Sequence, residues 1–301
     1  MEQFFQQLTN GLAVGGIYAL IALGYTMVYG VLKLINFAHS DLFTLGAYLG
    51  LTLLSSFLLT DRLGPFWGTI LLAAMVMGLI ALVGALLDRV AYRPLRESPR
   101  LSAVVSALGA SIFLQNTIML LYGARFQVYP QNILPATALN LFGIQVPVIR
   151  ILVLVASLGL MTVLYLFIQK TRIGTAVRAA AIDQGAARLM GIDVNRVILL
   201  VFMIGPALGG AAGLMVGLYY GQINFTMGWV YGLKAFTAAI LGGIGNIPGA
   251  MVGGLLLGII EALGATYLSV AWKDAIAFLV LILILIVRPT GLLGERVAEK
   301  V

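Results

Sequence analysis

Long apolar segments recur along this chain, and they constrain its fold more than any other feature. A helix needs about 20 mostly apolar residues to cross the hydrocarbon core of a membrane. Apolar runs of about that length, or somewhat shorter, cover residues 9–32, 36–59, 65–87, 101–122, 146–168, 197–221, 229–243, 250–267 and 275–287. Hydrophobic residues make up 61% of the 301 residues, against roughly 45–50% in soluble domains. The sequence therefore predicts an all-α polytopic membrane protein with about eight or nine spans.

The polar stretches between these runs are short, so residues 1–301 are expected to form a single transmembrane domain with no soluble domain. The net charge of +7 suggests a nucleic-acid partner, but the basic residues lie in the loops between apolar runs. Lys and Arg concentrate in the cytoplasmic loops of membrane proteins, so topology explains the charge and no nucleic acid is expected. Counting spans from the basic loops places the N-terminus outside and the C-terminus inside. Arg62, Arg125, Arg150 and Lys273 then fall outside or at the outer boundary, and Lys234 is unplaced.

The longest polar run between two clearly apolar segments is KTRIGTAVRAAAIDQGAARLMGIDVNR, residues 170–196. Its basic residues predict a cytoplasmic loop. The part TAVRAAAIDQGAARLM is rich in Ala, Leu, Arg and Gln and predicts one short helix, which Gly191 ends. Such a helix suits docking of a soluble partner, and a solvated connector is the equally weighted alternative.

Glycines recur every four residues in the sixth run. Small residues at this spacing form a stripe on one face of a helix and allow another backbone to approach closely. We expect this stripe to pack helices together; its members are Gly205, Gly209, Gly213, Gly217 and Gly221.

Catalytic motifs are missing from the sequence. The chain has one histidine and no cysteine, and it has no HExxH motif, so neither a metal site nor an enzyme is expected. The segment GGIGNIPG lacks the Lys-Ser/Thr of a phosphate-binding loop and has no strand before it. The chain is therefore expected to bind no cofactor and no ATP itself.

Ionisable groups inside apolar runs are costly, roughly 2.5 to 3.5 kcal/mol or more at mid-membrane, and each needs an explanation. Glu261 either faces a water-filled path or pairs with another helix, with Lys234 as the candidate partner. His39 and Asp41 lie at the cytoplasmic start of the second run, where bending or capping the helix is favoured over a proton relay.

Amide side chains are the other polar groups of interest. Gln115 and Asn116 either line a pathway or hydrogen-bond neighbouring helices, which is the commoner use. Lys273 and Asp274 are neighbours at an outer boundary, where an interfacial position without a function is expected. The candidates for the translocation path are Asn36, His39, Gln115, Asn116 and Glu261.

Several sequence blocks resemble one family, the LivH-type permease subunits of ABC importers for branched-chain amino acids. The blocks are GLAVGGIYALIALGYTMVYGVLKLINFAHSDLFTLGAY, RVAYRPLR, SALGASIFLQN, RAAAIDQGAARLMGIDVNRV, KAFTAAILGGIGNIPGAMVGGLLLGIIEAL and RPTGLLG. They extend over nearly the whole chain, and together they are highly specific. One departure is Ser40, where the family pattern has glycine, which bears on how sharply the helix bends there.

The resemblance implies partners that the residues alone do not reveal. Such permeases pair with a second, homologous permease and two cytoplasmic ATPases, which carry ATP and Mg²⁺, and they receive substrate from an extracytoplasmic binding protein. It implies the inner membrane of a bacterium or archaeon. It makes residues 170–196 the coupling loop that docks on an ATPase, with Arg178, Asp183, Arg188 and Gly191 as coupling candidates.

In this interpretation residues 123–148 form an extracytoplasmic loop, and Arg62, Arg125 and Arg150 are candidates for docking the binding protein. The implied substrates are leucine, isoleucine and valine, or related small amphiphilic solutes, moved by alternating access. A different class stays open, an ion-coupled transporter or channel that works without an ATPase and uses Glu261, His39 and Asp41 as its ion path.

Overall fold

The computed structural model describes residues 2–57, 64–96, 98–130, 138–141 and 144–294. Its long helices coincide with the predicted apolar runs to within a few residues at most ends. They are α1 (Glu2–Leu32), α2 (His39–Phe57), α4 (Pro65–Leu87), α5 (Arg100–Tyr122), α6 (Val148–Lys170), α9 (Val194–Tyr220), α10 (Met227–Gly242), α11 (Ile247–Tyr267) and α12 (Lys273–Val287). In the described part, seven helices are long and apolar enough to cross a membrane, and α2 and α10 are not among them. The prediction of an all-α polytopic membrane protein is confirmed.

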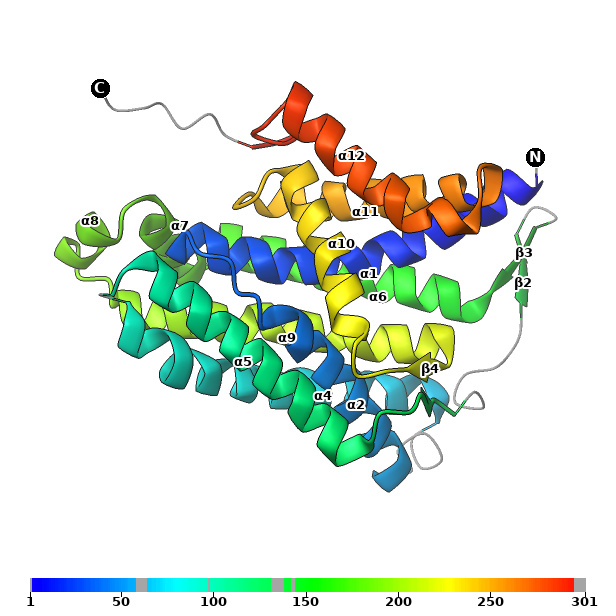
Figure 1. The fold of residues 1–301 in the computed structure, drawn as a ribbon, viewed down its shortest axis with the longest axis horizontal. Coiled ribbons are helices and arrows are strands. Elements are labelled where there is room, and N and C mark those ends of the chain that lie inside the picture. Colours follow the sequence, from blue (N-terminus) through cyan, green and yellow to red (C-terminus); the bar gives the residue numbers. More distant parts are fainter. Residues whose placement is uncertain (1, 58–63, 97, 131–137, 142–143, 295–301) are drawn as a thin grey trace.

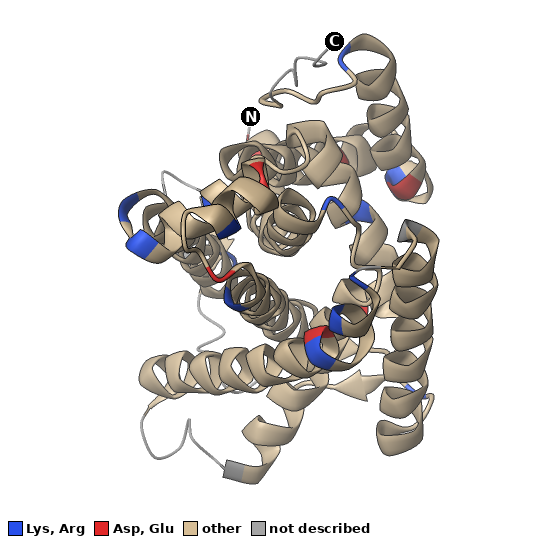
Figure 2. Ribbon diagram, turned by 90° about the vertical axis from the view of Figure 1, so that its left-hand side faces the viewer, with Lys and Arg blue, Asp and Glu red and all other residues tan. Residues whose placement is uncertain are grey.

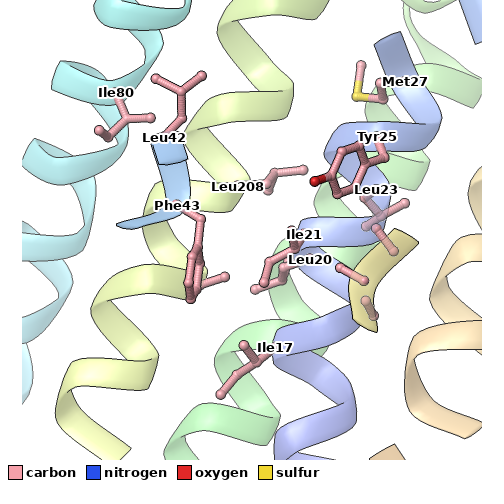
Figure 3. Packing of buried hydrophobic residues seen from close by; sticks show 14 of the residues in the cluster. Ile17, Leu20, Ile21, Leu23, Tyr25, Met27, Leu42, Phe43, Ile80 and Leu208 are labelled. Carbon is pink, nitrogen blue, oxygen red and sulfur yellow. The ribbon is translucent and has the colours of Figure 1, made fainter. Parts of the chain in front are cut away.

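Helix α1 lies at the centre of the bundle. It is apolar on every side, which is typical of a helix surrounded by other helices, and residues such as Ile17, Leu20 and Ile21 are fully buried. Helices α6, α9, α10 and α11 all pack against it. Figure 3 shows side chains of α1 in the same buried cluster as Phe43 of α2 and Leu208 of α9.

Glycines allow α1 and α11 to pack with their backbones in contact. A Cβ added to Gly11 would lie 2.8 Å from the Cα of Ile259, and one added to Gly15 would lie 2.9 Å from the carbonyl oxygen of Gly254. Neither position has room for a larger residue. This close crossing follows the small-residue pattern by which membrane helices associate.

Short elements occupy the two ends of the bundle. Strands β2 (Ala138–Leu141) and β3 (Ile144–Pro147) form an antiparallel hairpin at the end where α1 begins, and β1 (Gln127–Val128) pairs antiparallel with β4 (Gln222–Ile223). Helices α7 (Arg172–Ile182) and α8 (Gln184–Leu189) lie at the opposite end (Figure 1). Near them are the π-helix η1 (Asp88–Tyr92) and the 3-10 helix η2 (Arg93–Leu95), and a second 3-10 helix, η4 (Val270–Trp272), precedes α12. Figure 2 looks onto the α7–α8 end and shows Lys and Arg positions around it.

Two breaks in the chain differ in how well the sequence predicts them. The chain breaks between the predicted apolar runs 229–243 and 250–267: α10 ends at Gly242, Gly243 and Gly245 have positive φ, and Asn246 caps α11. The single helix predicted within residues 170–196 is wrong. Two helices replace it, because the extended backbone of Asp183 interrupts the Ala-rich segment and its carboxylate accepts hydrogen bonds from the first amides of α8.

Candidate functional site

Four of the five glycines in the predicted stripe on α9 face neighbouring elements at close range. A Cβ at Gly205 would lie 3.3 Å from Gly24 of α1, and one at Gly213 would meet the backbone of Phe43 and Ala47 in α2. Gly209 faces the ring of His39, and Gly217 faces the ring of Tyr129. The stripe therefore holds α9 against α1, α2 and the segment that follows β1.

Gly221 caps α9 with a left-handed backbone, φ 71°, which glycine adopts without steric cost. The last glycine of the four-residue spacing therefore also ends the helix, and its predicted packing role stays a prediction.

Tyr129 anchors the segment between α5 and α6 into the bundle. Its side chain is buried, its hydroxyl donates a hydrogen bond to the carbonyl of Ala47, and its backbone N–H donates to the carbonyl of Gly221 at 2.9 Å. Burial raises the pKa of the phenol, so the hydroxyl stays protonated and keeps donating. Part of the predicted outer loop, residues 123–148, is thus fixed to α2 and α9.

His39 is a packing residue in this structure. Its ring is fully buried between Gly24 and Gly209. The ring packs edge-on against that of Tyr25, with 4.8 Å between the ring centroids, and its Nε2 lies 3.1 Å from the carbonyl oxygen of Ile21. The ring fills the space that two glycines leave, which favours the structural interpretation over a proton relay.

The remaining polar candidates separate into inward and outward groups. Asn36 is buried, and its Oδ1 accepts a hydrogen bond from the Tyr92 hydroxyl at 2.7 Å. Gln115 is partly buried and lines a small cavity beside Asp41. Asn116 is exposed, and its amide donates to the carbonyl of Ile112 in its own helix at 2.8 Å.

Glu261 pairs with Lys234, the partner that the sequence suggested. The Glu261 carboxylate is 1% exposed, and its Oε1 lies 2.9 Å from Lys234 Nζ. The same oxygen also lies 2.9 Å from Lys273 Nζ and accepts a hydrogen bond from the Tyr18 hydroxyl at 3.1 Å. Two ammonium groups compensate this buried carboxylate, so it belongs to a structural ion network.

Lys273 and Asp274 are members of that network, which the sequence did not predict; their side chains are 33% and 62% exposed, in keeping with the expected interfacial position. Asp274 Oδ1 lies 2.6 Å from Lys234 Nζ. The residues of the network come from α1, α10, α11 and the first turn of α12, so their charges hold α12 against the bundle. The pairing joins positions that are separated in sequence, and hydropathy carries no signal for it.

The α7–α8 end contains the coupling candidates. Arg178 donates hydrogen bonds to the carbonyl of Ile168, in the last turn of α6, and to the Thr175 hydroxyl at 3.3 Å. Asp183 Oδ1 accepts from Gly185 N at 2.8 Å and Ala186 N at 3.0 Å. Both side chains therefore help to shape the loop itself.

Gly191 ends α8 as the sequence predicts. Its φ is 81°, and the amides of Gly191 and Ile192 donate to the carbonyls of Arg188 and Ala187 at 3.0 Å each. This pair of hydrogen bonds is the Schellman arrangement, in which glycine is the favoured residue. The chain can then turn directly into α9.

Exposed apolar side chains on this end are a feature that the sequence analysis missed. Ile182 is 87% exposed, Leu189 90% and Met190 82%. All three project from the polar end of the bundle and not from its membrane-spanning part, where apolar exposure is expected. The sequence does contain these apolar residues within a basic loop, but the loop was interpreted from its basic residues. We call Ile182, Leu189 and Met190 the apolar tip.

Basic residues from the segments after α4 and within α8 line a cavity at this end. A cavity of about 820 Å³ is lined by Arg93, Arg96, Arg188 and Gln184 among others. The guanidinium of Arg96 lies 2.5 Å from Asp88 Oδ1 and donates a hydrogen bond to Asn195 Oδ1 at 2.5 Å. These contacts connect the end of α4 to the start of α9.

Two further hydrogen bonds link α7 and α8 to the long helices. The Gln184 side chain donates to the carbonyl of Val31, near the end of α1, at 2.8 Å. Arg178 reaches α6 as described above. A displacement of α7–α8 is thereby connected to the central helix and to α6.

The arginines predicted to dock a binding protein are placed differently from one another. Arg125 is exposed next to β1, and Arg150 is half-buried beside the Tyr219 hydroxyl. Arg62 lies outside the described residues. Of the two described arginines, Arg125 is the more accessible to a partner.

The fold and these sites define a class of protein: a multi-span helical membrane protein whose buried charges join helices and whose polar end carries the α7–α8 loop. In the described ranges, no group of three or more His, Cys, Asp or Glu side chains is placed to hold a metal ion.

Comparison with known proteins then identifies the family. The family model described as "Branched-chain amino acid transport system / permease component" matches residues 7–285, and the chain belongs to this family. It is 44% identical to the high-affinity branched-chain amino acid transport system permease protein LivH of Escherichia coli K12, over 99% of this chain and 98% of that protein. It is 45% identical to BraD of Pseudomonas aeruginosa over the same shares, and 28% identical to a probable LivH of Methanocaldococcus jannaschii over 95% and 91%. No solved structure matches the chain.

Proposed function

We propose that this chain is the membrane permease subunit of an ATP-driven importer that moves branched-chain amino acids into the cytoplasm. The observation that carries the proposal is the near full-length similarity to branched-chain amino acid permeases, together with the multi-span bundle that the structure describes. The comparisons give no support to the ion-coupled alternative. Glu261 is one of the three ion-path residues of that alternative, and its Oε1 lies 2.9 Å from the Nζ atoms of two lysines.

The assembly that we propose contains a second, homologous permease, two cytoplasmic ATPases that bind ATP and Mg²⁺, and an extracytoplasmic binding protein. The basic α7–α8 end faces the cytoplasm, in keeping with the preference of Lys and Arg for that side. The start of α1 and the β2–β3 hairpin then face outward, since they lie at the opposite end (Figure 1). This orientation puts the N-terminus outside and the C-terminus inside.

The coupling surface that we propose is the apolar tip with Arg188 beside it. Buried apolar contacts supply most of the affinity at protein interfaces, whereas rim charges mainly affect on-rate and salt dependence. Arg178 and Asp183 support this surface by holding the shape of α7 and α8. Exposed Arg125 serves as a rim contact for the binding protein.

Movement of the tip reaches the bundle through identified contacts. Gln184 transmits displacement to α1, and Arg178 transmits it to α6. Helices α9 and α11 are each in close contact with α1, so the three move together as a rigid body. A path between the two permeases then alternates its opening as the ATPases close and separate.

Uptake by the reconstituted complex tests this proposal. The complex, purified with its native partners, is placed in proteoliposomes that contain ATP, and the binding protein and radiolabelled leucine are added outside. Leucine should accumulate only with hydrolysable ATP, and an imposed proton or sodium gradient without ATP should not drive its accumulation. Accumulation driven by a gradient without ATP would overturn the proposal in favour of the ion-coupled class.

A further inference from the structure

One buried carboxylate differs from all others in the described part of the chain. Asp41, Asp88 and Glu261 are the buried acidic residues there, at 4%, 2% and 1% exposure. Asp88 is paired with Arg96, and Glu261 with Lys234 and Lys273. Within the described ranges no Lys, Arg or His nitrogen lies within 4 Å of the Asp41 carboxylate.

No cationic side chain in the described ranges compensates the charge of Asp41, which lies in the first turn of α2. The hydroxyl of Ser111 on α5 donates a hydrogen bond to Oδ2 at 2.5 Å, and no other described side chain donates one to the carboxylate. A buried carboxylate without a cation costs several kcal/mol in general. A residue kept under that cost is a candidate for binding a cation that the protein chain itself does not provide.

A cavity lies directly beside Asp41. It has a volume of about 70 Å³, room for several water molecules or for one ammonium head group. Its polar lining consists of Tyr25, Ser40, Asp41, Ser111 and Gln115. The lining comes from α1, α2, α5 and α10, so the cavity is a meeting point of four helices.

The apolar lining of the same cavity opens outward. Trp229 is 65% exposed and Leu108 41% exposed, and Phe236 and Leu233 lie farther along α10. Gly232 packs closely against the polar lining, since a Cβ there would lie 2.5 Å from the Cβ of Ser40 and 3.1 Å from the Tyr25 hydroxyl. The cavity thus has a carboxylate beside it and aromatic and aliphatic groups at its mouth.

We propose that Asp41 binds the α-ammonium group of the transported amino acid, with Ser111 positioning the carboxylate and Trp229 and Leu108 contacting the apolar side chain. A primary ammonium supplies the charge and the donors that the carboxylate lacks, and such charge-assisted hydrogen bonds are strong. An aromatic ring at the mouth suits both a cation and an aliphatic chain. This inference rests on the proposed function and adds to it a recognition residue within the permease.

Fluorescence of Trp229 gives a direct test in the purified full chain in lipid nanodiscs. The other two tryptophans are replaced, Trp67→Phe and Trp272→Phe, so that Trp229 alone reports. The probes are leucine, isopentylamine, which has the ammonium without the carboxylate, and 4-methylpentanoate, which has the carboxylate without the ammonium. Leucine and isopentylamine should change the emission of Trp229, and 4-methylpentanoate should not.

Variants of the carboxylate then assign the effect. Asp41→Asn should raise the half-saturating concentration of leucine and isopentylamine by roughly tenfold or more, as expected for loss of a hydrogen bond to a charged group. Asp193→Asn, which removes an exposed carboxylate elsewhere, is the matched control and should have no effect. Should Asp41→Asn fail to fold, Ser111→Ala should weaken binding, and Ser106→Ala on the same helix should not, because the Ser106 hydroxyl bonds the carbonyl of Ala91.

Several results would overturn the inference: no response to leucine or isopentylamine, an equal response to 4-methylpentanoate, an equal response to potassium ions, or an unchanged affinity in folded Asp41→Asn. Transport separates this inference from the proposed function. If the wild-type complex imports leucine with ATP and the folded Asp41→Asn complex does so at the same rate, the ammonium site fails and the importer stands. If the wild-type complex imports no leucine at all, the proposed function itself fails.

Discussion

Buried charges in this protein are explained one residue at a time by what compensates them. Glu261 contacts Lys234, Lys273 and Tyr18, and Lys234 contacts Asp274 in turn. Removing one partner of a buried pair leaves an uncompensated charge, which costs about 3–5 kcal/mol in general. Each lysine therefore stabilises the packing of α10, α11 and α12.

Lys234→Met is expected to destabilise the protein by up to about 3 kcal/mol, because Lys273 still compensates part of the Glu261 charge. Thermal unfolding of the detergent-purified protein measures this as a lower Tm, with Lys170→Met, at an exposed position, as the control. Adding Glu261→Gln to Lys234→Met should restore part of the loss. Additive losses in the double variant would show that the two groups do not form an energetic pair.

Asp183 offers a separate prediction at the residue scale. Its carboxylate caps α8, so Asp183→Asn should preserve the cap and Asp183→Ala should cost about 1 kcal/mol of helix stability. ATP hydrolysis by the assembled complex, stimulated by loaded binding protein, should be near normal in the first variant and reduced in the second. Equal impairment in both variants would instead assign the effect to charged docking.

Among the elements, α9 shows how small residues determine helix arrangement. Gly213 has the backbone of α2 directly against it, whereas a Cβ at Gly159 on α6 has nothing within 4 Å. Both glycines lie inside long helices, so replacement by alanine raises the intrinsic helix propensity equally at the two positions. The two positions differ only in their surroundings.

Gly213→Ala should lower the Tm and the folded yield, because the added methyl group cannot fit against Phe43 and Ala47. Gly159→Ala should leave both unchanged or slightly raised, since alanine favours the helix by about 1 kcal/mol. Size-exclusion chromatography and thermal unfolding of the two variants check the difference. A tolerated Gly213→Ala would contradict the close contact of α9 with α2.

The elements also show what the sequence could and could not predict. Apolar runs located the long helices because hydropathy is a local property of the chain. The network around Lys273 and Asp274 escaped prediction because it depends on which helices meet. The Asp-Gln-Gly sequence indicates a break at Asp183, but the Ala-rich segments on both sides of it favour one continuous helix. Gly221 shared the spacing of the stripe, and only the backbone conformation identifies it as a cap.

At the scale of the whole molecule, the bundle presents one basic end and a central helix that connects to it. The apolar tip protrudes from that end, and Gln184 and Arg178 join it to α1 and α6. Such an arrangement suits contact of another protein with the tip, as we propose. The central claim is therefore that separate ATPases bind there and drive this permease.

Leu189→Asp is the most suitable variant for this claim, because Leu189 is 90% exposed and its replacement leaves the fold of the chain undisturbed. A charge at the centre of an apolar contact should weaken ATPase binding by roughly 2 kcal/mol or more. Arg178→Glu is less suitable, because Arg178 also holds the corner between α6 and α7. Arg125→Ala at the opposite end is the matched control.

The most direct measurement is gentle purification of the tagged chain from its native host, followed by mass spectrometry of the bound proteins. We expect two ATPase subunits and a second permease to be recovered with the wild-type chain and with Arg125→Ala, and Leu189→Asp to lose the ATPases while keeping the permease partner. Recovery of the chain alone or as a homo-oligomer without ATPases, or full ATPase recovery with Leu189→Asp, would contradict it.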